Sequence, residues 1–106
     1  MATINIARDF SRTPGARYIS DGPYSGELFR TNHLEPLFRT VPPAQSIVIE
    51  LDGTAGFATS FLEESFGGLV RKFGSAAVMG KIEFRSLEDP SLIHEIQGYM
   101  SDAEKA

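Results

Sequence analysis

The chain has 106 residues, of which 42% are hydrophobic, and its formal net charge is −4. This length fits one domain, and the apolar content is too high for a disordered chain. The absence of cysteine excludes disulfide frameworks and thiolate metal sites. Because there is no basic stripe, we do not expect nucleic acid as a partner. No apolar run approaches the roughly 18 residues of a membrane span, and the N-terminus lacks a signal-peptide layout, so we expect no membrane segment and a cytoplasmic location.

We expect residues 1–24 to form an N-terminal hairpin. Residues 3–7 alternate polar and apolar side chains, which is typical of a half-buried strand. The pair Pro14–Gly15 favours a turn, after which residues 17–19 would return as a second strand.

Residues 26–40 predict a kinked helix or two short helices. Ser25 is a suitable N-cap, and Glu27 places negative charge in the first turn. Pro36 interrupts the run, because proline cannot donate the helical backbone hydrogen bond. The prolines after Val41 end the helix.

A central strand and a second helix follow. Residues 46–51 form a β-branched, nearly continuous apolar run, which is typical of a strand at the centre of a sheet. In the helix over residues 60–74, Ser60 and Glu63 match the S-x-x-E capping box, and a terminal glycine fits the helix end. Gly67–Gly68 predicts a close approach of this helix to the sheet.

Residues 81–85 alternate and predict a further strand, and Asp89–Pro90 opens a final amphipathic helix through Met100. We expect residues 101–106 to form a frayed tail. The element order is therefore β-β-α-β-α-β-α, which indicates a single α/β domain over residues 1–106, with a mixed or mainly parallel sheet of about four strands.

Two segments carry a resemblance to known families. Residues 47–74, IVIELDGTAGFATSFLEESFGGLVRKFG, resemble the central strand, loop and helix of the STAS domain of anti-sigma factor antagonists. Residues 14–30, PGARYISDGPYSGELFR, resemble a STAS-like family of unassigned function, DUF4325. Its members pair a Ser-Gly-Glu-x-Phe-Arg helix start with a Thr/Ser-Ser-Phe helix start, which here begin at Ser25 and Thr59.

The resemblance implies a non-enzymatic regulatory domain that binds a protein. In the STAS family the first serine of the Asp-Ser-Ser-Gly motif is phosphorylated by an anti-sigma kinase of the histidine-kinase-like ATPase class, and its position here is Thr59. Ala58 replaces the acidic residue of that motif. Phe61 replaces its glycine, which would place a large ring where the kinase approaches. The implied docking residues are Asp52, Thr54, Thr59, Ser60, Phe61, Glu63 and Glu64.

Other interpretations remain open. Thr59 and Ser60 could serve only to start a helix. The loop from Gly53 to Gly56 follows the central strand, where α/β sheets bind ligands, so a small-molecule or nucleotide sensor is the alternative. Residues 50–54 resemble the D-x-D-G-T strand end of a phosphatase, but glutamate occupies the nucleophile position, and Asp52 at a strand end more commonly bonds its own backbone.

We expect no metal site and no cofactor, because the histidines, His33 and His94, lie on different predicted helices. The arginines of residues 8–30 fit either an acidic partner or a solvated strand edge. A homodimer is possible, and the edge of the expected hairpin is where we would look for it.

Overall fold

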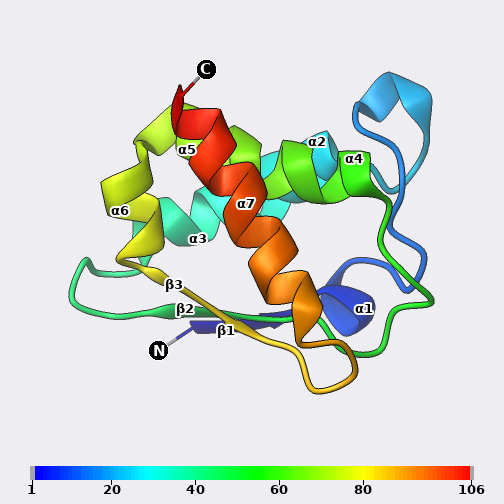
Figure 1. The fold of residues 1–106 in the computed structure, drawn as a ribbon, viewed down its shortest axis with the longest axis horizontal. Coiled ribbons are helices and arrows are strands. Elements are labelled where there is room, and N and C mark those ends of the chain that lie inside the picture. Colours follow the sequence, from blue (N-terminus) through cyan, green and yellow to red (C-terminus); the bar gives the residue numbers. More distant parts are fainter. Residues whose placement is uncertain (1, 106) are drawn as a thin grey trace.

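The computed structural model describes residues 2–105, which form one parallel sheet with helices on one of its sides (Figure 1). The three strands of the described residues are β1 (Ala2–Asn5), β2 (Ile47–Glu50) and β3 (Ile82–Arg85), in the spatial order β1-β2-β3. Strand β2 pairs with both neighbours, which confirms its predicted central position.

The register divides the sheet into an apolar and a polar face. Ile4, Ile49 and Phe84 lie side by side across the strands, on the face that the helices cover. The opposite face carries the charged side chains of Glu83 and Arg85, and both are exposed. All the strands are parallel, so each connection runs through the helical layer.

The helical segments account for most of the chain. Figure 1 shows the helices α2 to α7 above the sheet and α1 beside one end of it. Their bounds are α1 (Ile6–Asp9), a 3-10 turn (Ile19–Asp21), α2 (Gly26–Phe29), a π-helical turn η2 (Arg30–Leu34), α3 (Glu35–Thr40), α4 (Thr59–Leu62), a π-helical turn η3 (Glu63–Gly67), α5 (Gly68–Phe73), α6 (Ser75–Met79) and α7 (Ser91–Lys105).

The predicted hairpin of residues 1–24 is wrong. After β1 the chain turns into α1, where Asn5 Oδ1 accepts a hydrogen bond from the backbone N–H of Arg8 at 2.9 Å. Residues 17–19 form no strand, because the carbonyl of Arg17 accepts a hydrogen bond from the N–H of Glu27 in α2. The three strands of the described residues are all parallel, as the mainly parallel alternative predicts, while the mixed arrangement and a fourth strand are not found.

The helix predicted over residues 26–40 is confirmed in its bounds, and its interruption is a π-helical turn. Segments α2, η2 and α3 follow one another without a gap and end at Val41, whose backbone is extended. The N–H of Glu35 donates to the carbonyl of Arg30, five residues back. This wider turn stands directly before Pro36, where the missing N–H removes the usual helical bond.

The second long helical segment runs through α4, η3 and α5, from Thr59 to Phe73. It starts two residues earlier than a capping box at Ser60 predicts, and its N-cap is Ala58, which has no oxygen in its side chain. The capping box of Ser60 and Glu63 is therefore wrong. The predicted end at Gly74 is confirmed, since this glycine has a φ of +90°.

The helical C-terminus also differs from the expectation. Helix α7 continues to Lys105 and buries Ala103 in the core, so the frayed tail predicted for residues 101–106 is wrong over residues 101–105. Residue 106 lies outside the described residues. None of the helices in the described range is long and apolar enough to cross a membrane.

Candidate functional site

The start of α4 lies directly after the central strand and its loop. Thr59 is the first helical residue and is exposed, whereas Ser60 is half-buried. Because the N-cap is Ala58, no capping side chain covers the N–H groups of the first turn. Thr59 therefore presents its hydroxyl group at the open N-terminal end of a long helical segment.

Helix α7 passes beside this helix start. The hydroxyl group of Tyr99 donates a hydrogen bond to Glu95 Oε2 at 2.8 Å. Burial and that bond raise the pKa of Tyr99, and a hydrogen bond with the Thr59 side chain acts in the opposite direction. The side chain of Thr59 thus lies near Tyr99 of α7.

Asp52 ties two loops together at the carboxyl ends of β2 and β3. Its carboxylate accepts hydrogen bonds from the backbone N–H groups of Leu87 at 3.0 Å and Glu88 at 2.9 Å. In return Glu88 Oε1 accepts from the N–H of Gly53 at 2.7 Å, where a φ of +99° suits glycine. The sequence indicated a bond to the backbone of Asp52's own loop, whereas the partner is the loop after β3.

A cavity of about 270 Å³ opens between these two loops. Thr54 and Phe57 line one side of it, and Glu88 and Asp89 line the other. The wall also includes Asp52, so three acidic residues contribute to the lining. A small molecule has room here, and a second hollow of about 330 Å³ borders Gly53 on the side of Arg8 and Arg12.

The side chains of Glu63 and Glu64 project from the π-helical turn η3 and form a set of ion pairs. Glu63 Oε1 accepts from Arg17 at 2.5 Å, and Glu63 Oε2 accepts from Arg71 at 2.7 Å. Hydrogen bonds from Arg71 lower the pKa of Glu63; burial opposes this, and Arg17 adds to the lowering. Glu63 therefore links a loop to a helix, which explains why it does not cap its own helix.

Arg30 is the centre of this set. Its guanidinium donates to Glu64 Oε2 at 2.9 Å, to the carbonyl of Glu64 at 3.2 Å and to Glu35 Oε2 at 2.6 Å. Its Nε lies only 2.6 Å from the position that a Cβ on Gly68 would take. The predicted close approach of Gly67–Gly68 to the sheet is thus wrong, because these glycines make room for the side chains of Glu63 and Arg30.

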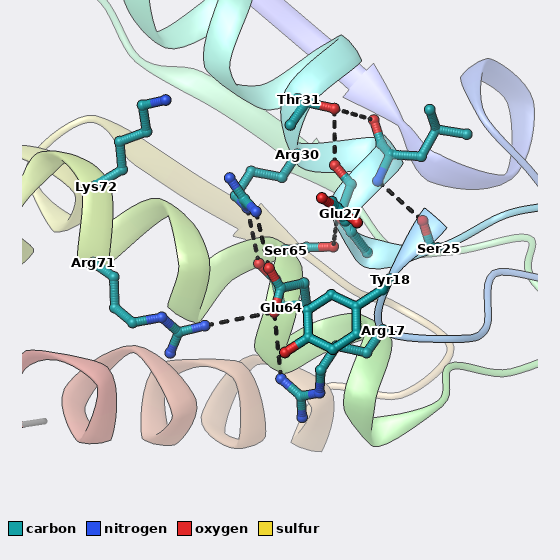
Figure 2. Close-up of polar contacts among 12 residues, drawn as sticks. Arg17, Tyr18, Ser25, Glu27, Arg30, Thr31, Glu64, Ser65, Arg71 and Lys72 are labelled. Atoms are coloured by element: carbon teal, nitrogen blue, oxygen red, sulfur yellow. Dashed lines mark hydrogen bonds and ion pairs between the residues drawn. The ribbon is translucent and has the colours of Figure 1, made fainter. Parts of the chain in front are cut away.

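We call this set the Arg30 cluster. Figure 2 shows the guanidinium groups of Arg17, Arg30 and Arg71 pointing toward Glu64 from three segments of the chain. Only 4% of the Glu35 side chain and 9% of the Glu64 side chain are exposed. The cluster comprises Arg17, Arg30, Glu35, Arg39, Glu63, Glu64, Arg71 and Lys72.

The electrostatics of Glu35 show how the cluster tolerates burial. Burial raises the pKa of Glu35, but hydrogen bonds from Lys72 and Arg30 outweigh it, so the pKa lies below its ordinary value. The Lys72 ammonium group is 3.0 Å from Glu35 Oε1. Since both π-helical turns contribute residues to the cluster, two irregular helical turns meet at one set of charges, and π-turns are frequent at functional sites.

The first turn of α2 contacts the first turn of α4. Ser25 caps α2, since its Oγ accepts from the N–H of Leu28 at 3.1 Å. A Cβ on Gly26 would lie 2.6 Å from the carbonyl oxygen of Phe61. Phe61 itself is fully buried, with its ring centroid 5.7 Å from that of Phe29. Its ring thus lies in the core and not where a kinase would approach.

The structure places the predicted docking residues in three separate locations. Asp52 and Thr54 lie in the loop after β2, and Thr59 and Ser60 lie at the helix start. Phe61 is in the core, while Glu63 and Glu64 belong to the Arg30 cluster.

Sequence reasoning missed the cluster itself. The Ser-Gly-Glu-x-Phe-Arg pattern contained Arg30, but nothing local indicated that it pairs with Glu64, which lies 34 residues away. Within residues 2–105 no group of three histidine, aspartate or glutamate side chains is arranged to hold a metal ion.

Comparison with known proteins identifies one family. The model of the family described as STAS-like domain of unknown function (DUF4325) matches residues 25–92, which is more than half of the chain. No curated protein and no solved structure matches the chain at a significant level.

Proposed function

The chain belongs to the STAS-like DUF4325 family, and from this premise we propose that it is a non-enzymatic regulatory domain that binds a protein partner at the start of α4. The observation that carries the proposal is the exposed Thr59 at the open end of the segment that follows the central strand. The partner we propose is a histidine-kinase-like ATPase in the cytoplasm.

Phosphorylation of Thr59 is the switch in this proposal. A phosphate adds about −1.5 to −2 charges at neutral pH, and free N–H groups at a helix start favour it. The same group would stand one helical turn from Glu63 and close to Tyr99, which is bonded to Glu95. An acidic or apolar partner surface that fits the unmodified helix start would then be repelled.

The exposure of the two hydroxyl groups supports Thr59 over Ser60 as the acceptor. Thr59 is exposed, but Ser60 is half-buried. A kinase needs to surround the accepting oxygen, so we expect the modification at Thr59 alone. The variant Ser60→Ala should be phosphorylated like wild type, whereas Thr59→Ala should not be phosphorylated.

The test compares partner binding by wild type, Thr59→Glu and Ser101→Glu. Ser101 is an exposed residue of α7, so the control adds the same charge away from the helix start. We expect an ATPase of the histidine-kinase-like class to bind wild type and Ser101→Glu, and we expect no binding to Thr59→Glu. Equal binding of all three forms would contradict a switch at Thr59. In a separate experiment, incubation of the purified ATPase and this chain with ATP tests the phosphate transfer directly.

The cavity between the loops after β2 and β3 supports a second candidate, a small-molecule sensor. Its volume is about 270 Å³, and the three acidic residues in its lining favour a cationic ligand over a nucleotide, whose phosphates they would repel. A ligand that binds only the folded chain raises the melting temperature. A rise in melting temperature with small amines, abolished by Asp89→Asn, would favour the sensor. If no amine raised the melting temperature, the sensor hypothesis would be rejected.

A further inference from the structure

Strand β3 is an edge of the sheet with unused backbone groups. The carbonyls of Lys81 and Arg85 accept hydrogen bonds from Ile47 and Leu51, so these residues face β2. Because strand residues alternate, the N–H and C=O groups of Ile82 and Phe84 face outward. Within residues 2–105, β3 pairs with β2 alone, and no bond to these outward groups is found.

The other edge strand, β1, is equally four residues long, but its end is partly blocked. The outward N–H of Asn5 in β1 donates to Asp9 Oδ2 at 2.9 Å, because α1 folds back over the strand end. In contrast, a hollow of about 390 Å³ lies between β3 and α7, lined in part by Phe84, Ile93 and Gln97. The edge at β3 is therefore hollowed on the side of α7.

The charges of β3 are complementary to a second copy of themselves. Glu83 and Arg85 project from the polar face, with 54% and 53% of their side chains exposed, and they pair with each other at 3.2 Å. If two β3 strands run antiparallel about a two-fold axis at Phe84, Glu83 of one copy lies opposite Arg85 of the other. The outward backbone groups then form the hydrogen-bonded pairs, and the charged residues form the closer, non-hydrogen-bonded pairs.

Exposed apolar side chains flank the same edge. Leu87, which follows β3, is 89% exposed, and Met79, which precedes it, is 46% exposed. In the register centred on Phe84, Leu87 of one copy lies opposite Lys81 of the other, close to its Met79. Charged residues often protect a sheet edge from pairing, but here the alternation of signs attracts an antiparallel copy, and the exposed side chains add apolar contact.

We propose that β3 is a self-association edge, at which two copies of the chain join their sheets antiparallel about Phe84. The pairing extends each sheet across the two-fold axis and makes a six-stranded sheet. The start of α4 takes no part in the pairing, so this inference does not rest on the proposed binding of a partner at Thr59.

The first experiment measures association by sedimentation equilibrium over a wide range of concentration. We expect a monomer–dimer equilibrium for wild type. Glu83→Arg and Arg85→Glu should each weaken the dimer roughly tenfold or more, since each places two like-charged pairs at the axis. The double variant E83R/R85E should restore the wild-type affinity, because every opposite pair is re-formed.

The second experiment tests the register with introduced cysteines, which is straightforward because the chain has none of its own. Glu83→Cys mixed with Arg85→Cys should form an intermolecular disulfide, as non-hydrogen-bonded partners have Cα atoms about 4.5 Å apart. Glu83→Cys alone should not, because diagonal neighbours stand about 7–8 Å apart. A monomer at every concentration, a dimer insensitive to the charge variants, or equal cross-linking of Glu83→Cys alone would overturn the proposal.

Discussion

Replacing Arg30 by methionine should cost the protein a large part of its stability. The side chain is 15% exposed and donates three hydrogen bonds, two of them to carboxylates on other turns. Methionine keeps much of the volume but removes the charge and all three donors. Because Glu35 and Glu64 stay buried, the cost is mainly that of leaving carboxylates with fewer partners.

The magnitude follows from the partners that remain. Glu64 keeps Arg17 at 3.5 Å and Arg71 at 3.8 Å, and Glu35 keeps Lys72 at 3.0 Å. Breaking a buried pair typically costs about 3–5 kcal/mol, and these remaining cations reduce the loss, so we expect a decrease of about 2–4 kcal/mol in the free energy of unfolding. A domain of this size has about 5–15 kcal/mol in total.

Urea unfolding, followed by circular dichroism, measures this loss against a matched control. Arg39→Met removes another arginine that contacts Glu35, but its side chain is 54% exposed and its contact is 3.4 Å long. We expect a change below about 0.5 kcal/mol for that variant. If Arg30→Met lost less than about 1 kcal/mol, or no more than Arg39→Met, the cluster would not be the buried support described above.

Three further outcomes follow from the same contacts. Gly26→Ala should lower the free energy of unfolding by about 1–3 kcal/mol because its Cβ would meet the carbonyl of Phe61, whereas Gly98→Ala on α7, with open space at the Cβ, should be neutral or stabilising in the same urea assay. Lys81→Met should cost about 1.5–3 kcal/mol in thermal unfolding, since the ammonium group holds the carbonyls of Phe38 and Val41 at the end of α3. The pKa of Glu63 is lowered from its ordinary value of 4.5. Its contribution to the free energy of unfolding should therefore be present above pH 4.5 and lost as the pH falls through the lowered pKa. When urea midpoints are measured over a series of pH values, Glu63→Gln should reduce the fall of the midpoint at acid pH. An unchanged fall would contradict this role of Glu63.

The parts of the fold that follow from local patterns could be predicted from the sequence. The β-branched run of residues 46–51 contains β2, the alternation of residues 81–85 contains β3, and the bounds of the helix over residues 26–40 are confirmed. Each of these signals depends on which side chains face the core. That information is present in a few neighbouring residues.

The errors came from contacts between distant residues. Residues 15–24 carry turn signals that fit a hairpin, but their backbone bonds to the start of α2, as in the pair Ala16 and Gly26. Glu63 has the spacing of a capping box, but Arg17 and Arg71 offer charged donors that outcompete a helix N–H. A local pattern carries no information about a charge that arrives from 46 residues away.

The two sequence motifs that carry the family resemblance meet as one packed unit. Ser25 caps α2, Gly26 allows its first turn to contact Phe61, and Arg30 reaches across to Glu64. These residues are engaged with each other, so their chemistry is used to hold two helix starts at a fixed separation. What this unit leaves exposed at the start of α4 is Thr59. In the proposed switch, a phosphate on Thr59 would add its charge beside these packed helix starts, so a partner would meet a changed surface there.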